Sequence, residues 1–137
     1  MTYTGKCLCG ATSFVAKGEP DGPHACHCED CLRWCGGPFF GVTFSGGADI
    51  SGDAVVWYRS SDWAERGHCS KCGAAMFYRF QDGSHFNSAL GFLDDRDQFG
   101  PMKEHIFIDN KPAACEFSDT APKLTAAETL KMFTGEA

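Results

Sequence analysis

Hydrophobic residues in this chain form short runs separated by glycine, proline, aspartate and serine. Runs of aromatic and β-branched residues between such turn formers are typical of short β-strands. They predict strands at residues 55–59, 74–80, 85–90 and 105–108, and two more at 12–16 and 38–44. Glycine-rich segments at 18–22 and 46–47 are predicted to form turns. The pattern as a whole predicts a mainly β fold.

Two short helices complete the predicted elements. Residues 29–34 are expected to form one helical segment. Near the end of the chain, Thr125 and Glu128 have the spacing of a capping box, in which each side chain satisfies a backbone N–H group of the first helical turn. The apolar residues Leu130, Met132 and Phe133 follow, so a C-terminal helix is predicted there.

The composition fits one globular domain over residues 1–137. The chain is 43% hydrophobic and 13% aromatic, which is enough to build a core at this length. Residues 1–11 contain one lysine and no apolar run of signal-peptide length, and no stretch approaches the roughly 20 apolar residues that span a bilayer. We therefore expect a soluble, cytoplasmic protein.

Nine cysteines are present, and their odd number excludes complete intramolecular disulfide pairing. In a reducing compartment, cysteines clustered at short spacings are typically metal ligands or catalytic thiols. The spacings between them are therefore the main evidence for function.

The first cluster combines two distant pairs, Cys7 with Cys9 and Cys69 with Cys72, and a glycine follows each pair directly. Glycine adopts a positive φ without penalty, which lets a tight turn point its backbone N–H groups at the sulfurs. Four thiolates from two such turns suit tetrahedral zinc, which would join two distant segments of the chain. Taken alone, each pair could instead be two small buried hydrophobic residues.

The second cluster has three cysteines within six residues, Cys26, Cys28 and Cys31. Cys26 and Cys28 would point to the same side of an extended segment, and Cys31 could fold back from the first turn of a helix. Three protein ligands leave one zinc coordination position open, which is the pattern of a catalytic site. His27, between two ligands, is expected to point away from the metal, and His24 to lie at the surface or in a loop.

Cys35 leaves an alternative open at the second cluster. It follows Cys31 by four residues, so on a helix the two sulfurs would share a face and could close a four-thiolate site. The same cysteines could in principle hold an iron–sulfur cluster, although their spacing matches no ferredoxin pattern. Cys115 is expected to be a small buried residue within a strand.

The net charge argues against nucleic acid as a partner. The formal charge is −6 at pH 7. Seven ligating thiolates and two zinc ions would change it by −7 and +4, to about −9. A domain that binds nucleic acid normally carries a basic patch that contacts phosphates.

The order of these motifs resembles that of the glutathione-dependent formaldehyde-activating enzyme family, which includes zinc domains of the centromere protein V type. Gly-x-Cys-x-Cys-Gly is followed by Cys-His-Cys-x-x-Cys with Gly-Gly-Pro-Phe just after it, and then by Cys-x-x-Cys-Gly. The matching segments are 5–10, 26–39, 66–73, 93–95, position 101 and 105–107, so they cover nearly the whole chain. The triple-cysteine motif is much more specific than a lone Cys-x-x-Cys.

The resemblance implies an Mss4-like, mainly β fold with two zinc ions per chain. The implied activity is that of a carbon–sulfur lyase, in which glutathione or a similar thiol occupies the open zinc position and condenses with formaldehyde to S-(hydroxymethyl)glutathione. The family usually has a small residue where this chain has Cys35, and commonly a tryptophan near 114–115. The residues that match the structural zinc ligands are Cys7, Cys9, Cys69 and Cys72, and those that match the catalytic ligands are Cys26, Cys28 and Cys31.

Several further roles stay open. His27 and His105 are candidate proton donors on the basis of side-chain pKa alone. Positively charged side chains could pair with the carboxylates of glutathione, and aromatic residues near the second cluster could belong to the core or to a pocket wall. The charged candidates are Arg33, Arg59 and Lys71, and the aromatic ones are Trp34, Phe39 and Phe40.

Two other classes of function are compatible with the same motifs. One is a zinc-stabilised protein-binding module in which both metal sites are structural. The other is a redox or metal sensor that releases zinc when the cysteines from Cys26 to Cys35 form disulfides. The number of protein ligands at the second cluster, and a cleft beside it, would distinguish an enzyme from the binding module, whereas reversible disulfide formation with zinc release would identify the sensor.

Overall fold

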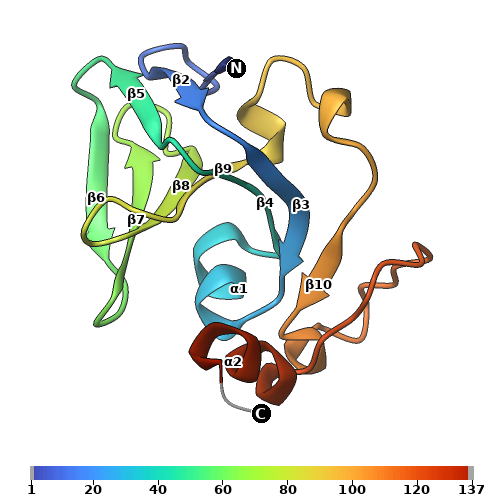
Figure 1. Cartoon of the computed structure of the whole chain (residues 1–137). Helices are drawn as coiled ribbons and strands as arrows, with labels where there is room; N and C mark the ends of the chain where they lie inside the picture. Colours follow the sequence, from blue (N-terminus) through green and yellow to red (C-terminus); the bar gives the residue numbers. More distant parts are fainter. Residues whose placement is uncertain (1, 136–137) are drawn as a thin grey trace.

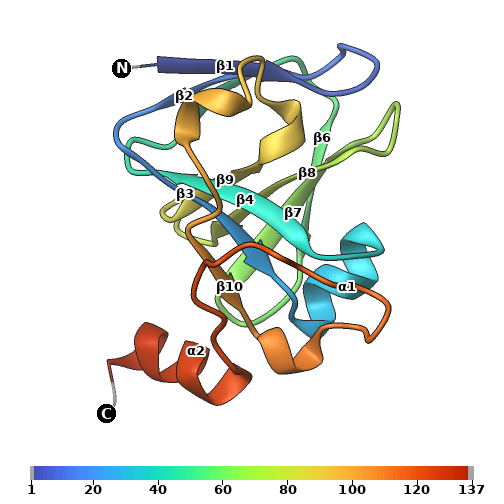
Figure 2. The same cartoon turned by 90° about the vertical axis from the view of Figure 1, so that its right-hand side faces the viewer.

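The computed structural model describes residues 2–135, and Figures 1 and 2 show it from two directions. Within these residues, ten strands form two sheets, and two α-helices lie at the end of the molecule away from the smaller sheet. The mainly β fold predicted from the sequence, with cysteine clusters that could hold zinc, is confirmed.

The smaller sheet has three antiparallel strands, with β2 in the centre. Their order is β1 (Thr2–Lys6), β2 (Ser13–Lys17) and β5 (Ala48–Ser51). Figure 2 shows β1 crossing one end of the molecule.

The larger sheet has seven strands, and all neighbours are antiparallel except β10 and β3, which are parallel. Cys26, at the end of β3, pairs with Ile106 of β10 on one side and with Phe39 of β4 on the other. The end of β3 is therefore fixed from both sides. The strand order is β10 (Glu104–Ile106), β3 (Pro20–Cys26), β4 (Phe39–Phe44), β9 (Phe86–Ala89), β8 (Ala75–Phe80), β7 (Ala64–Cys69) and β6 (Val55–Arg59).

The main core contains buried side chains from both sheets. Phe14 of β2 meets Phe77 of β8 edge to face, with ring centroids 5.0 Å apart, and Tyr3 of β1 packs on Phe44 of β4 at 5.3 Å. Burial of one large apolar side chain stabilises a fold by about 1.5–3 kcal/mol. Two cysteines of the first cluster, Cys7 and Cys69, belong to the same buried group.

The predicted strands agree with β6, β8, β9, β2 and β4, with shifts of one residue at some ends. The strand expected at 105–108 ends at Ile106, because Phe107 has a φ of 54° and a 3-10 helix, η3 (Ile108–Asn110), follows. The turn expected at 18–22 is shorter, since β3 already begins at Pro20. Strands β1, β3, β5 and β7 were not predicted. The remaining 3-10 helices are η1 (Leu90–Phe92) and η2 (Asp97–Phe99).

Helix α1 (Glu29–Cys35) agrees with the predicted segment to within one residue. The N-cap residue is Cys28, whose Sγ accepts a hydrogen bond from the backbone N–H of Cys31, 3.4 Å away. The helix ends at Gly36, which has a left-handed φ of 77°. The first turn of α1 is therefore built around two of the clustered cysteines.

Helix α2 (Ala126–Thr134) has both hydrogen bonds of the predicted capping box. Its apolar residues Leu130, Met132 and Phe133 are about half exposed. The helix is instead attached to the segment after β10 through the buried Thr129, because the Thr129 hydroxyl oxygen accepts a hydrogen bond from the backbone N–H of Phe107 at 3.0 Å. Within residues 2–135, no helix has the length and apolar character needed to cross a bilayer.

Gly5 provides a test of the packing between β1 and β2. A Cβ atom at this position would lie 2.4 Å from the ring of Phe14 and 2.5 Å from the backbone oxygen of Phe92. Since a backbone oxygen cannot move aside cheaply, we expect Gly5→Ala to lower the free energy of unfolding by about 1–3 kcal/mol in urea denaturation. Gly91→Ala is the control, because its Cβ would meet no heavy atom within 4 Å. Equal losses in the two variants would contradict this packing.

Candidate metal centres

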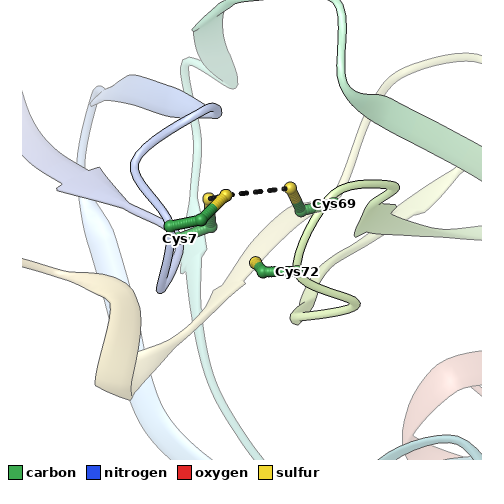
Figure 3. Close-up of side chains that lie close together, drawn as sticks. Cys7, Cys69 and Cys72 are labelled. Atoms are coloured by element: carbon green, nitrogen blue, oxygen red, sulfur yellow. Dashed lines mark hydrogen bonds between the residues drawn. The ribbon is translucent and has the colours of Figure 1, made fainter.

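The first cluster joins the turn after β1 to the turn after β7. The sulfurs of its four cysteines lie within 4.8 Å of one another, and Figure 3 shows those of Cys7, Cys69 and Cys72 directed into one common space. The Sγ atoms of Cys7 and Cys9 are 3.7 Å apart, and those of Cys9 and Cys69 are 3.8 Å apart. A tetrahedron with zinc–sulfur bonds of about 2.3 Å has sulfurs about 3.8 Å apart. The four sulfurs therefore fit a zinc ion in both number and spacing.

Backbone N–H groups surround these sulfurs, as the glycine positions predicted. Gly10 and Gly73 have left-handed φ values of 81° and 77°. The backbone N–H of Thr12 lies 3.4 Å from the Sγ of Cys7. Hydrogen bonding from the backbone of Cys72 lowers the pKa of Cys69 to about 6. The backbone around Cys69 thus favours its thiolate, which is the form that binds a metal.

The second cluster lies where β3 passes into α1. Cys26 ends the strand, Cys28 caps the helix and Cys31 is in its first turn, and the three sulfurs lie within 4.8 Å of one another. This is the arrangement expected from the sequence. Hydrogen bonds from Cys26 and Cys31 lower the pKa of Cys28 to about 2, while the same contact with Cys28 raises the pKa of Cys26. Only one sulfur can ionise easily, so full ionisation of the three requires a nearby cation.

Cys35 is outside this group. It is the last residue of α1 and is exposed, and within residues 2–135 the sulfur group consists of Cys26, Cys28 and Cys31 alone. The prediction for Cys115 was wrong: it is half-buried in an irregular segment, where its N–H group bonds to the carbonyl oxygen of Pro112 in a turn.

Arg66, for which no role was predicted from the sequence, contacts the second cluster from β7. Its guanidinium Nη1 donates to the Sγ of Cys31 at 3.5 Å, and its Nε donates to the hydroxyl of Ser60 at 3.2 Å. The guanidinium carbon lies 5.1 Å from the ring centroid of Trp34 and 4.9 Å from that of Tyr78. Arg66 is only 4% exposed.

The cysteines are the anionic partner of this buried cation. Among residues 2–135, no aspartate or glutamate forms an ion pair with Arg66. Burial is the largest single effect and lowers the pKa of Arg66, but its interactions with Cys31, Cys28 and Tyr78 together raise that pKa above its ordinary value. A buried cation is costly unless an anion compensates it, so the position of Arg66 fits a negatively charged sulfur cluster.

His27 points away from the sulfurs, as predicted, and belongs to a buried chain of polar side chains. Its Nε2 lies 3.0 Å from the Nδ1 of His105, whose Nε2 lies 3.0 Å from both carboxylate oxygens of Asp119. Both imidazoles are fully buried, and Phe117 packs against each of them. Burial lowers the pKa of His27 to about 4, with a further contribution from His105, so His27 is neutral at pH 7.

The carboxylate determines which nitrogens carry protons. Because Asp119 only accepts, His105 donates through Nε2 and its Nδ1 accepts from the Nε2–H of His27. The Nδ1 of His27 then carries no proton, and this buried atom has no hydrogen-bond partner among residues 2–135. The backbone N–H of His27 also bonds to the carbonyl oxygen of Ile106 at 3.0 Å. Both contacts attach the Cys26–Cys28 segment to β10.

The remaining candidate residues are placed as follows. His24 is half-buried in β3, where its Nε2 lies 3.4 Å from the hydroxyl of Thr43, so the expected surface or loop position was wrong. Arg33 is exposed and pairs with Glu29 along α1 at 2.8 Å. Arg59 and Lys71 are also exposed.

A cavity of about 500 Å³ is lined by Trp34 and Cys35 of α1, but Cys26, Cys28 and Cys31 do not line it. Trp34, which stacks on Arg66, and Phe39, which pairs with Cys26, both contribute to its wall. Its volume is within the range of about 300–1,000 Å³ that is usual for small-molecule sites. Phe40 and Cys35 also line it, whereas Arg33, Arg59 and Lys71 do not. A larger cavity of about 680 Å³, between the turns after β4 and β8, contains no cysteine.

Comparisons with known proteins agree with this arrangement. Residues 2–110 match the sequence model of a family described as glutathione-dependent formaldehyde-activating enzyme. The chain is 29% identical over 130 residues to a protein of Schizosaccharomyces pombe named as an uncharacterized lyase, covering 94% of this chain and 95% of that protein. A crystal structure of a Rhodobacter sphaeroides protein has the same fold, with a TM-score of 0.55 and 18% identity over 72% of this chain and 96% of that one.

The polar chain provides a test that is independent of metal. We expect His105→Phe to lower the free energy of unfolding by about 1–3 kcal/mol, because it leaves the Nε2–H of His27 and the carboxylate of Asp119 without their partner. Urea denaturation of His105→Phe, Asp119→Ala and the double variant forms a double-mutant cycle. Asp119→Ala should cost much less in the His105→Phe background than alone. Additive losses would show that the two side chains are not coupled.

Proposed function

Because this chain belongs to the glutathione-dependent formaldehyde-activating enzyme family, we propose that it is a zinc-dependent lyase that joins a thiol such as glutathione to formaldehyde. The proposal includes two zinc ions per chain with different roles. Cys7, Cys9, Cys69 and Cys72 would hold the structural ion, and Cys26, Cys28 and Cys31 would hold the catalytic one.

The observation that carries the proposal is the group of three sulfurs at the start of α1, the helix whose Trp34 and Cys35 also line a cavity. Three protein ligands leave a coordination position for a ligand from outside, whereas a fourth cysteine would close the site. Within residues 2–135 Cys35 does not join the group, although it lines the same cavity. The arrangement supports an enzyme more than a protein-binding module with two closed structural sites.

Residues around the second cluster can each be assigned a role in the proposed reaction. Zinc bound at this site would lower the pKa of an incoming thiol and so supply a thiolate nucleophile at neutral pH. Arg66 compensates the charge of the resident thiolates from a fixed, buried position. The aromatic side chains of Trp34 and Phe39 would limit water around the bound thiol. His105 and Asp119 hold the Cys26–Cys28 segment in place through His27.

The proposed reaction balances without another reactant. A carbon–sulfur bond forms between the thiol sulfur and the carbonyl carbon of formaldehyde, and the carbonyl oxygen takes up the proton that left the thiol. The relative from Schizosaccharomyces pombe is named as a lyase, which is the reaction class of this step in its reverse direction.

The two metal sites should respond differently to mutation. We expect Cys72→Ser to lose one zinc ion and most of its stability, because this site is continuous with the core. Cys28→Ser should lose the other zinc ion, keep the fold and lose catalysis. The measurements are zinc content by elemental analysis, thermal unfolding, and exchange NMR of glutathione with formaldehyde. If Cys28→Ser unfolds as severely as Cys72→Ser, or retains wild-type exchange rates, the catalytic assignment is wrong.

A Cys35→Ser variant distinguishes a second metal site with an open coordination position from one that Cys35 closes as fourth ligand. With an open site, Cys35→Ser should keep both zinc ions during dialysis against a chelator and bind glutathione with unchanged affinity by calorimetry. With a closed site, the same variant should lose zinc more readily and could gain the ability to bind an outside thiol. The second result, or a metal–sulfur distance to Cys35 of about 2.3 Å, would contradict the proposal.

A further inference from the structure

We propose that Arg66 keeps Cys31 as an unreactive metal ligand, so that the electrophile does not add to this resident sulfur in place of the incoming one. The inference rests on the proposed function, since it concerns how a zinc site built from thiolates distinguishes its own sulfurs from that of the substrate. Arg66 acts through Cys31 and is therefore a positioning residue.

The need for such a residue follows from the charges. Three thiolates and one zinc ion carry a net charge of −1, and an incoming thiolate would make it −2. Thiolates on an electron-rich zinc ion stay nucleophilic, and the substrate thiolate would be chemically similar to the three cysteines. Formaldehyde could then form a carbon–sulfur bond at the Sγ of Cys31 while its oxygen takes a proton from water. That adduct would remove a charged ligand from the metal.

The geometry gives Cys31 a donor that an incoming thiol would lack. The Nη1 of Arg66 donates to the Sγ of Cys31 at 3.5 Å, and both residues are almost fully buried, at 4% and 3% exposure. A charge-assisted hydrogen bond withdraws electron density from the accepting sulfur and is stronger in a buried site. The lone pair of Cys31 is therefore less available for attack on a carbonyl carbon.

The guanidinium of Arg66 is also held in place, so it cannot turn away from Cys31 toward another anion. Its guanidinium lies between the rings of Trp34 and Tyr78, and its Nε is bonded to Ser60. These contacts fix the direction of Nη1 toward Cys31, and they come from α1, β8 and the residue after β6. A side chain that only neutralised charge would not need an aromatic clamp and a separate acceptor for Nε.

Cys26 provides an internal reference in the same cluster. Its sulfur belongs to the same group of three, and among residues 2–135 the hydrogen bonds of Arg66 go to Cys31 and Ser60 and not to Cys26. Loss of Arg66 should therefore raise the reactivity of Cys31 relative to that of Cys26. A residue that served only to pack the site would change both cysteines together.

The experiment measures alkylation of the zinc-loaded protein by iodoacetamide without glutathione. Samples are quenched over time, and fragment-ion mass spectrometry assigns the label to each cysteine. In Arg66→Met, which keeps an unbranched side chain but has no donor, we expect the ratio of Cys31 to Cys26 labelling rates to rise about tenfold. Arg66→Lys retains the charge without the planar fork and should give a smaller rise of the same ratio.

Arg79→Met is the matched control. Arg79 also stacks on a tryptophan, 3.6 Å from the ring centroid of Trp57, and pairs with Glu65, and among residues 2–135 it makes no hydrogen bond to a cysteine. Its replacement should leave the Cys31 to Cys26 ratio at the wild-type value. A wild-type ratio in Arg66→Met, or a uniform rise at all cysteines, would overturn the proposal. If Arg66→Met does not fold with both zinc ions, the Arg66→Lys variant is used for the test instead. A wild-type ratio of Cys31 to Cys26 labelling in Arg66→Lys would then overturn the proposal.

The exchange NMR assay of the wild-type protein is run in parallel. If the wild-type protein does not catalyse exchange between glutathione and formaldehyde, the proposed function fails whatever the labelling ratios are. If it catalyses exchange and the ratio in Arg66→Met is unchanged, the function stands and the role given to Arg66 fails. The two results are therefore distinguishable.

Discussion

Mutual repulsion between closely packed sulfurs is the constraint on which this structure depends. Seven cysteines are gathered into two groups, and within each group every sulfur lies within 4.8 Å of the others. Thiols at such distances share protons, and only a cation allows all of them to ionise together. Backbone N–H groups at the first cluster and the guanidinium of Arg66 at the second both favour negative sulfur. Sulfurs arranged and supported in this way suit metal binding better than disulfide formation.

The two clusters are attached to the fold in different ways, and this explains how one can serve stability and the other chemistry. Cys7 and Cys69 are buried in the group of side chains that joins the two sheets, so a metal there would link β1 to β7 through the core. Cys26, Cys28 and Cys31 occupy a single strand-to-helix connection. A metal there closes a local loop and contributes less to the overall fold. A local site can bind and release a ligand without unfolding the rest.

The sequence predicted those parts of the site that depend on local spacing. Cys28 and Cys31 are three residues apart, so an extended residue followed by one helical turn was enough to bring them together. Arg66 could not be assigned, because its contact with Cys31 joins residues 35 positions apart and its strand was not recognised. Strand β7 contains Glu65, Arg66, Gly67 and His68, which lack the aromatic and β-branched character used to identify strands. Its place inside the sheet comes from pairing with β6 and β8.

The polar chain extends the second site beyond the residues that match the family. That match ends at residue 110, while Asp119, which accepts a hydrogen bond from the Nε2–H of His105, lies in the segment that follows. Phe117 of the same segment covers both imidazoles, and Thr129 of α2 is bonded to the backbone of Phe107, two residues after His105. Buried histidines are held in one tautomer by the acceptor at the end of their chain. The segment after residue 110 therefore adds contacts that reach the backbone between Cys26 and Cys28 through His105 and His27, although none of its described residues belongs to either sulfur cluster.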